Sequence, residues 1–293
     1  MSAERTDFVI PTTVDDAVAE ISSGTAMVLG GGTSVALLIG QNLLCPSKLV
    51  CVTRIPELRS IDVDPSARVV RLGAAVTLRD LQTHPQLTSL LPSLVFAAGE
   101  VGNPRVRSAA TVGGAVAHSD PRQDLPPVLL SLGATVSLAG PRGTRQVPLS
   151  GFATGFMETK LESDELITGI VVPLVSGRRA HYSRFTPQSI ADYPSVGVAA
   201  CVTCDDSGVV TEAKVAVAGA ASTAMEVDAA SLLVGSAPDG SGIDDAISEV
   251  ARLAALGSEP VDDRLGSAHY KQAMVSVWTK RALQACIKPA RAV

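Results

Sequence analysis

Two adjacent glycines lie near the start of the stretch from Thr111 to Asp124, which constrains the chain more than any other part. The hydroxyl of Thr111 precedes the pair Gly113-Gly114, and the carboxylates of Asp120 and Asp124 follow it. Because glycine has no Cβ, the main chain can come close to a ligand there and expose its amide N–H groups. A threonine hydroxyl can add a donor, and a carboxylate can accept hydrogen bonds from sugar hydroxyls. This combination predicts a loop that binds a nucleotide diphosphate.

A second glycine run lies far upstream, where residues 30–34 (Gly-Gly-Gly-Thr-Ser) follow the apolar residues 26–29. The apolar run predicts a buried strand, the glycines a turn, and residues 34–39 the start of a helix. Such a unit presents main-chain N–H groups to an anion. Either run alone also fits a tight turn or a close packing contact. Neither is a P-loop or a G-x-G-x-x-G fingerprint, so an ordinary Rossmann NAD site is disfavoured.

The hydrophobic pattern changes at residues 175–179, which predicts a domain boundary. Before the boundary we expect short helices and strands, with helices over 12–21, 34–39, 92–98 and 125–132, a further helix capped by Thr77, and strands over 26–29, 49–52, 58–63, 68–72, 134–138, 144–147 and 166–172. After it we expect a three-stranded meander over 180–185, 196–204 and 209–217, followed by helices over 226–233, 242–256 and 267–286.

Charge and composition exclude several classes of protein. The net charge of −5 argues against a nucleic-acid binder, because neutralising phosphates needs clustered Lys and Arg. No apolar run approaches the roughly 18 residues of a membrane span, and the first residues lack the basic-then-apolar order of a secretory signal. We therefore expect a soluble, cytoplasmic protein.

Metal and catalytic patterns are weak. Cys201 and Cys204 have CxxC spacing, but residues three apart on a strand point to opposite faces, so we expect two packing residues. No second pair completes a zinc site, and the four histidines never fall at metal spacing. Asp120 and Asp124 suit sugar binding better than a metal pair, and His118 is expected to be a hydrogen-bonded neighbour. We predict no metal ligand and no catalytic residue in this chain.

The order of the motifs resembles the FAD-binding medium subunit of molybdenum hydroxylases, the carbon monoxide dehydrogenase and xanthine dehydrogenase flavoprotein family. The segments that carry the resemblance are 30–34, 72–77, 111–124, 164–167 and 182–193. It covers nearly the whole chain and implies an α+β fold. A two-lobed FAD-binding domain of the vanillyl-alcohol-oxidase (PCMH) type is expected over 1–176, with lobes of about 1–55 and 56–176. A C-terminal flavoprotein domain with a three-stranded antiparallel sheet and helices is expected over 177–293.

The resemblance also implies which residues hold the FAD. Both glycine runs would wrap the pyrophosphate, Asp124 would lie near the ribityl or ribose hydroxyls, and Leu166 and Ile167 would pack on the isoalloxazine. The implied cofactor-binding set is Leu29, Gly30, Gly31, Gly32, Thr33, Ser34, Val35, Thr77, Ala110, Thr111, Gly113, Gly114, Ala115, Asp120, Asp124, Leu166, Ile167 and Arg184.

Three positions depart from the family pattern. Ala115 replaces the usual Asn, Arg184 the usual Lys, and Gln188 a later basic residue. Arg184 has two interpretations: a permanent cation near the flavin ring, or a surface ion pair on the outer face of its strand.

The resemblance implies an electron-transfer function. The chain would take electrons from a small 2Fe–2S subunit and pass them to an external acceptor, while a large subunit with the molybdenum cofactor oxidises the substrate. Two 2Fe–2S clusters are expected in the partner, and a dimer of heterotrimers, a heterohexamer, is the expected assembly. Two alternatives stay open: a self-sufficient FAD-dependent oxidoreductase, and a non-enzymatic nucleotide-binding module.

Overall fold

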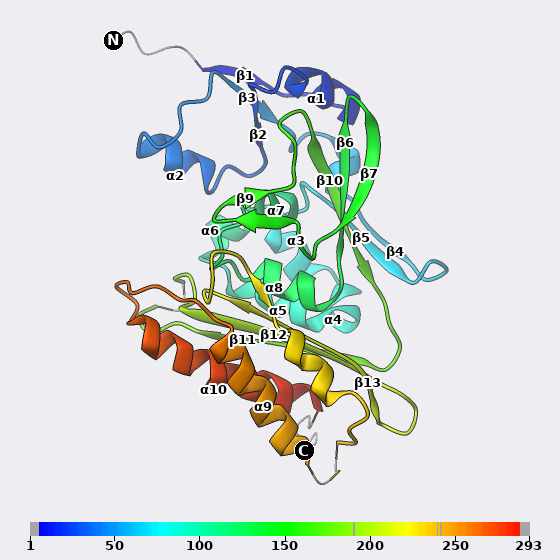
Figure 1. Ribbon diagram of the computed structural model, residues 1–293. Helices are drawn as coiled ribbons and strands as arrows, with labels where there is room; N and C mark the ends of the chain where they lie inside the picture. The colour runs from blue at the N-terminus through cyan, green and yellow to red at the C-terminus, as the bar shows by residue number, and fades with distance from the viewer. Residues whose placement is uncertain (1–5, 190, 239, 241, 288–293) are drawn as a thin grey trace.

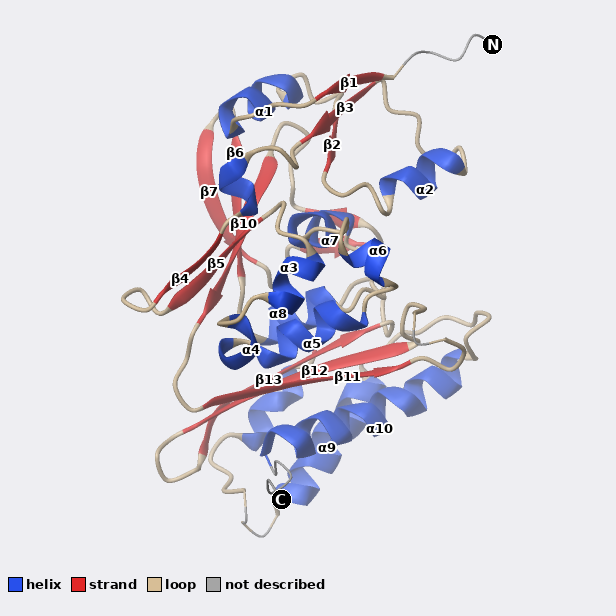
Figure 2. Cartoon of the chain, turned by 180° about the vertical axis from the view of Figure 1, so that it is seen from behind, coloured by secondary structure: helices blue, strands red, loops and turns tan. Residues whose placement is uncertain are grey.

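The computed structural model describes residues 6–189, 191–238, 240 and 242–287, and these form three layers (Figure 1). A small parallel sheet lies at one end, a five-stranded sheet with a group of short helices in the middle, and a four-stranded sheet backed by two long helices at the other end (Figure 2). The α+β class expected from the sequence is therefore confirmed.

The first layer is a parallel sheet in the order β1-β3-β2 with two helices. Its elements are β1 (Asp7–Val9), α1 (Val14–Ile21), β2 (Met27–Leu29), α2 (Val35–Gly40) and β3 (Lys48–Cys51). Helix α1 begins where the Thr13 hydroxyl accepts a hydrogen bond from the N–H of Asp16. Its buried face, Ala17 and Ile21, packs with Val50 in a small separate core. The glycine run thus follows β2 directly and leads into α2, as predicted.

The middle layer is an antiparallel sheet in the order β4-β5-β10-β6-β7. Its strands are β4 (Ile61–Asp64), β5 (Val69–Gly73), β6 (Thr135–Gly140), β7 (Gly143–Pro148) and β10 (Leu166–Pro173), preceded by the 3-10 turn η1 (Pro56–Arg59). The central strand is β10, which pairs through Ile170 with Leu72 on one side and with Val136 on the other. A short hairpin, β8 (Ala153–Gly155) with β9 (Glu158–Thr159), leads into it.

Short helices fill the space between this sheet and the C-terminal sheet: α3 (Leu78–Thr83), α4 (Leu87–Leu90), α5 (Pro92–Glu100), α6 (Pro104–Arg107), α7 (Val112–His118) and α8 (Leu125–Ser131). Thr77 caps α3 with a complete capping box, as the sequence predicted. The stretch after Thr111 differs from the expected loop. It forms helix α7, because Thr111 caps its first turn and the buried Val112 and Val116 anchor it on the core.

The last layer is an antiparallel sheet in the order β11-β12-β13-β14, with strands β11 (Arg178–Phe185), β12 (Val196–Cys204), β13 (Val210–Ala218) and β14 (Met225–Glu226). Helices α5 and α8 cover one face, while α9 (Ile243–Leu256) and α10 (Ala268–Ile287) pack on the other side (Figure 1). The sheet therefore contains one short strand, β14, more than the three that the sequence predicted.

The helix predicted over 226–233 is only partly correct. Met225 and Glu226 pair with β13, and residues 228–233 form the 3-10 turn η2 (Asp228–Leu233). Its buried side chains, Ala230 and Leu233, are three residues apart, which is the repeat of a 3-10 helix.

The two cysteines with CxxC spacing lie on opposite faces of β12, as predicted. Cys201 belongs to the core shared with the middle layer, whereas Cys204 packs towards the core under α9 and α10. The described part of the chain contains no cluster of His, Cys, Asp and Glu that could hold a metal ion. No helix in the described ranges is both long and apolar enough to cross a bilayer.

Candidate functional site

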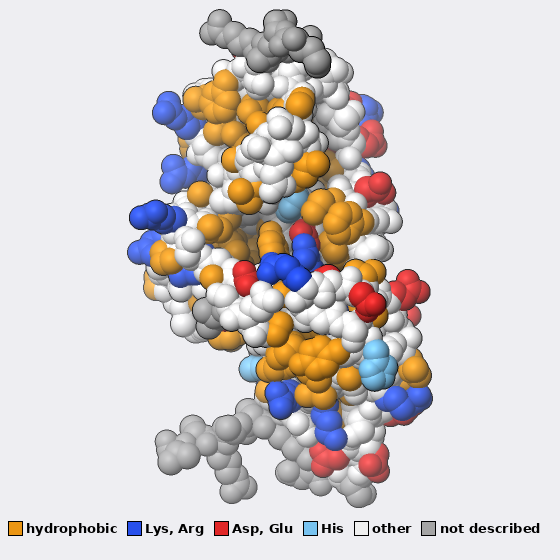
Figure 3. Space-filling model, turned by 90° about the vertical axis from the view of Figure 1, so that its left-hand side faces the viewer, with side chains coloured by type: hydrophobic (Ala, Val, Ile, Leu, Met, Phe, Trp, Pro, Cys, Tyr) orange, Lys and Arg blue, Asp and Glu red, His pale blue; other side chains and the backbone are white. Residues whose placement is uncertain are grey.

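A cavity of about 780 Å³ lies where the three layers approach one another. Its walls come from the glycine run after β2, from α7, and from the segment 159–165 between β9 and β10. Figure 3 shows a face that is hollowed about halfway up, with hydrophobic side chains around the hollow and charged side chains at its lower edge. The volume is within the range of roughly 300–1,000 Å³ typical of sites for small molecules and cofactors.

The two glycine segments predicted from the sequence touch each other at this cavity. An ideal Cβ on Gly31 would lie 1.6 Å from the carbonyl oxygen of Ala109, and one on Gly30 would lie 2.6 Å from Thr111 Oγ1. Gly32 has a φ of +72°, in the left-handed region that favours glycine. The close contact therefore requires glycine, and it aligns two stretches of exposed backbone along one wall.

The beginning of α7 forms the adjoining wall. The Thr111 hydroxyl accepts a hydrogen bond of 3.1 Å from the N–H of Gly114, which lines the cavity without a side chain. Gly113 does not line the cavity but packs against Ala74, where an added Cβ would lie 2.5 Å from the Cβ of Ala74. Its absence lets α7 pack on the turn after β5.

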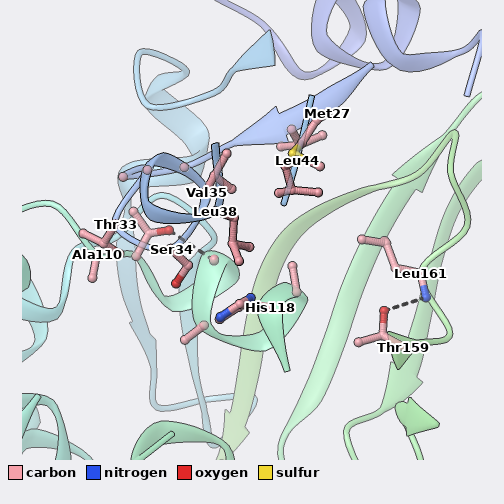
Figure 4. A pocket seen from close by; sticks show the side chains of 18 of the residues that line it. Met27, Thr33, Ser34, Val35, Leu38, Leu44, Ala110, His118, Thr159 and Leu161 are labelled. Atoms are coloured by element: carbon pink, nitrogen blue, oxygen red, sulfur yellow. Dashed lines mark hydrogen bonds between the residues drawn. The ribbon is translucent and has the colours of Figure 1, made fainter. Parts of the chain in front are cut away.

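The facing wall is the segment 159–165, where Thr159 and Leu161 lie across from Leu38 and His118 (Figure 4). One arginine holds this wall in place. Arg145 donates to both carboxylate oxygens of Glu165, each at 2.7 Å, and to the carbonyl oxygen of Lys160 at 3.2 Å. These bonds hold the pKa of Glu165 below its ordinary value.

A buried polar cluster connects the cavity to the C-terminal sheet. Asp124 lines the cavity and is 3% exposed. Its Oδ1 accepts a hydrogen bond of 2.7 Å from the Tyr182 hydroxyl and lies 3.2 Å from Arg184 Nε. Arg184 also donates to the carbonyl oxygens of Glu100 and Asp192. Burial raises the pKa of Asp124 to about 6, although Arg184 and Tyr182 act in the opposite direction.

Many of the predicted site residues meet in this cavity. Those that line it are Gly30, Gly31, Gly32, Thr33, Ser34, Val35, Ala110, Thr111, Gly114, Ala115 and Asp124. They come from three separate stretches of the chain, which the fold brings together.

Other predicted residues lie outside the cavity lining: Leu29, Thr77, Gly113, Asp120, Leu166, Ile167 and Arg184. Thr77 caps α3 instead. The Asp120 carboxylate turns back to the N–H of Arg122 at 2.9 Å. The side chains of Leu166 and Ile167 are buried in two separate hydrophobic cores. Arg184 is 5% exposed, so its interpretation as a surface ion pair is wrong.

Several residues at the cavity were not predicted as site residues. His118 lies on α7 at the spacing of Gly114 plus four, so helical periodicity could have identified it; burial lowers its pKa. Tyr193 lines the cavity from the C-terminal half, and burial raises its pKa. Glu165 lies in the segment 164–167 that carries the resemblance, but its place at the cavity was not predicted, because the arginine that holds it lies twenty positions away.

Comparisons with known proteins agree on one family. A family model described as the FAD binding domain in molybdopterin dehydrogenase matches residues 4–175, and one described as the CO dehydrogenase flavoprotein C-terminal domain matches residues 181–286. The chain is 32% identical to the carbon monoxide dehydrogenase medium chain of Hydrogenophaga pseudoflava, over 97% of this chain and 98% of that protein. It is 31% identical to the 6-hydroxypseudooxynicotine dehydrogenase complex subunit alpha of Paenarthrobacter nicotinovorans, over 97% and 95%.

The solved structures agree with this result. Carbon monoxide dehydrogenase from Hydrogenophaga pseudoflava, lacking the Mo-pyranopterin moiety of its molybdenum cofactor, contains a chain that superposes with a TM-score of 0.89 at 33% identity. The match covers 98% of both chains. The FAD domain type expected from the sequence, followed by a C-terminal domain with an antiparallel sheet, is thereby confirmed.

Proposed function

The chain belongs to the family of FAD-binding medium subunits of molybdenum hydroxylases, and from this premise we propose that it is the electron-transfer subunit of such a complex. It would take electrons from an iron–sulfur partner and deliver them to an external acceptor. The observation that carries the proposal is the glycine-lined cavity, in which two stretches of bare backbone lie side by side. FAD, when bound, supplies the electron-accepting chemistry.

The residues present fit this cofactor. Gly114 carries no side chain at the cavity wall, and a Cβ on Gly31 would overlap the backbone of Ala109. We propose that residues 30–34 hold the pyrophosphate by their N–H groups, while Gly114, whose own N–H donates to Thr111 Oγ1, leaves space for it. Apolar side chains that line the cavity after the first glycine run, such as Leu38 and Leu44, suit a flat ring system. Asp124 is the acceptor proposed for a ribityl or ribose hydroxyl.

Partners follow from what the chain lacks and from its relatives. The part of the chain that the structure describes holds no cluster of metal ligands, so iron–sulfur groups must come from elsewhere. One relative is named as a subunit of a dehydrogenase complex and another as a medium chain. We propose a large subunit with the molybdenum cofactor, a small subunit with two 2Fe–2S clusters, and a dimer of these heterotrimers.

We also propose a division of the chain into two domains. Residues 1–176 would form the FAD-binding domain and residues 177–293 the C-terminal domain, which contributes Tyr182 and Arg184 beside the cavity. The free cysteines suit the reducing cytoplasm, which we propose as the compartment.

The first test is the replacement of Gly114 by valine. An ideal Cβ on Gly114 would lie 2.9 Å from Thr111 Oγ1, and valine adds two methyl groups at the cavity wall, so the purified protein should lose its FAD absorbance while its circular dichroism stays unchanged. Gly40→Val is the matched control, because Gly40 also lies in a short helix but has no atom within 4 Å of its ideal Cβ. Stoichiometric FAD in the Gly114 variant would contradict the assignment of this wall.

The second test is purification of the complex from its native cell. Co-elution of two further subunits with molybdenum and iron supports the electron-transfer proposal. A chain that elutes alone and oxidises a substrate without partners would instead indicate a self-sufficient flavin enzyme.

A further inference from the structure

The Asp124 carboxyl lies between the cavity and the C-terminal sheet. It lines the cavity, and it is also held by the C-terminal sheet through Tyr182 and Arg184. Gly197, opposite Arg184 in the neighbouring strand, makes room for this arrangement, because a Cβ there would lie 2.4 Å from the Tyr182 hydroxyl oxygen. The position of the carboxyl is therefore built by residues from both domains.

Around the Asp124 carboxyl, two carboxylates lie near only one positively charged side chain. Arg184 lies 3.2 Å from Asp124 Oδ1 and 3.7 Å from a carboxylate oxygen of Glu100, at the end of α5. Two acids thus share one guanidinium, while Tyr182 from β11 contributes a neutral donor. Such an arrangement holds one proton more readily than an isolated ion pair does.

Three other titratable groups at the cavity, Glu165, His118 and Tyr193, are less suited to bind a proton near neutral pH. Glu165 is held in its charged form by Arg145, which lowers its pKa. Burial lowers the pKa of His118, so it stays neutral, and burial raises the pKa of Tyr193, so it also stays neutral. The pKa of Asp124, raised to about 6, is already close to neutral pH.

A ligand that fills the cavity should raise the pKa of Asp124 further. A ligand that displaces water from a buried carboxyl disfavours its charged form, and the negative charge of a pyrophosphate in the same cavity does so too. We propose that Asp124 takes up one proton from solvent when FAD fills the cavity, so that FAD affinity depends on pH, with Tyr182 and Arg184 as positioning residues. The inference rests on the proposed function, because it assigns the cavity to FAD.

The direction of the pH dependence follows from linkage. If Asp124 binds its proton more tightly in the complex, FAD binds more tightly at low pH. Affinity falls as pH rises from the pKa of the free protein, about 6, to the higher pKa of the complex. Within that interval the dissociation constant rises by up to about tenfold per pH unit for one proton.

The experiment is calorimetric titration of FAD into the full-length chain after removal of its flavin. At each pH the binding enthalpy is measured in two buffers of different ionisation enthalpy, and the difference gives the number of protons taken up. FAD itself does not titrate between about pH 5.5 and 8, so any uptake belongs to the protein. We expect net uptake with a maximum above pH 6 in the unmodified chain.

Three variants identify the group. Asp124→Asn should bind FAD without proton uptake, whereas Glu249→Gln, an exposed carboxylate on α9 far from the cavity, should leave uptake unchanged. Tyr182→Phe removes a hydrogen bond that favours the charged carboxylate, so its uptake maximum should move to higher pH. If Asp124→Asn fails to bind FAD, Tyr182→Phe still tests whether Asp124 is the group that takes up the proton.

The outcomes separate the two proposals. FAD binding with zero or negative proton uptake, or uptake that persists in Asp124→Asn, overturns this inference but leaves the proposed function intact. An unmoved maximum in Tyr182→Phe overturns it as well. Absence of FAD binding to the unmodified chain overturns the proposed function itself.

Discussion

Replacing Arg184 by methionine should destabilise the chain in a pH-dependent manner. The side chain is 5% exposed and lies beside a carboxylate, Asp124, that is 4% exposed. Removing one partner of a buried ion pair costs about 3–5 kcal/mol, because the other charge remains buried without compensation. Methionine keeps the apolar stem, so the loss comes from the guanidinium. We expect this loss in the free energy of unfolding at about pH 8.

The pH dependence has a definite sign. The pKa of Asp124 is raised from its ordinary 3.8 to about 6, a difference of about 2 units or about 3 kcal/mol against folding at neutral pH. Its folded pKa exceeds its unfolded pKa, so stability falls as pH rises through that interval. Without Arg184 the folded pKa rises further, and the penalty grows over a wider range. At about pH 5 the carboxyl is protonated in both proteins, so the loss should shrink to about 1–2 kcal/mol from the hydrogen bonds to carbonyl oxygens.

Urea unfolding at both pH values measures this difference. Arg178→Met is the matched control: Arg178 lies on the same strand, is 9% exposed and also donates to two backbone carbonyls, but its carboxylate partner Glu212 is 44% exposed. Its loss should be nearly equal at the two pH values. The double variant Arg184→Met/Asp124→Asn should lose the pH dependence too. A loss for Arg184→Met below about 1 kcal/mol at pH 8, or one that does not change with pH, would refute the reasoning.

Three further predictions use other parts of the cavity. Gly31→Ala should cost about 1–3 kcal/mol in urea unfolding and weaken FAD binding at least about tenfold in a fluorescence titration, because its Cβ has no space. Arg145→Met should lower the midpoint of urea unfolding more than Arg142→Met does, because the carboxylate partner of Arg145 is 6% exposed whereas the Arg142 side chain is 60% exposed. The Arg145 loss should shrink as pH falls through the lowered pKa of Glu165. Exposed Cys45 should react with iodoacetamide well before Cys286, whose pKa burial raises to about 12; peptide mapping by mass spectrometry that finds the reverse order would contradict this.

Local signals in the sequence were sufficient for much of the fold and for one side of the site. Helix α1 and helix α3 begin at Thr13 and Thr77 because a hydroxyl caps each of them within three residues. The glycine runs mark backbone without a Cβ, although their meeting at one cavity depends on the contact between Gly31 and Ala109, which are distant in sequence. The helix caps and the glycine runs themselves depend on neighbours in sequence, so they can be recognised in a single chain.

The remaining features depend on partners that are distant in sequence. Arg145 and Glu165 are twenty residues apart, and Asp124 and Tyr182 are 58 apart, so no spacing rule joins them. Arg184 was expected beside the ring or on the surface, whereas two carboxylates and two carbonyls draw it into the interior. Helix α7 was read as a loop because its glycines weaken helix propensity, and core packing of Val112 outweighs that weakness.

The position of β10 in the middle sheet also sets the order in which the protein can fold during synthesis. Strand β10 is the last of the five strands to leave the ribosome, yet it lies between β5 and β6 and pairs with both. The hairpins β4–β5 and β6–β7 must therefore wait with unpaired edges until residue 173 has emerged. Nascent chains stopped before β10 should be protease-sensitive and prone to edge-to-edge association, and chains released just after it should be the first to resist digestion. The cavity, whose facing wall leads directly into β10, cannot be complete before that moment, and Tyr193, which also lines it, emerges later still.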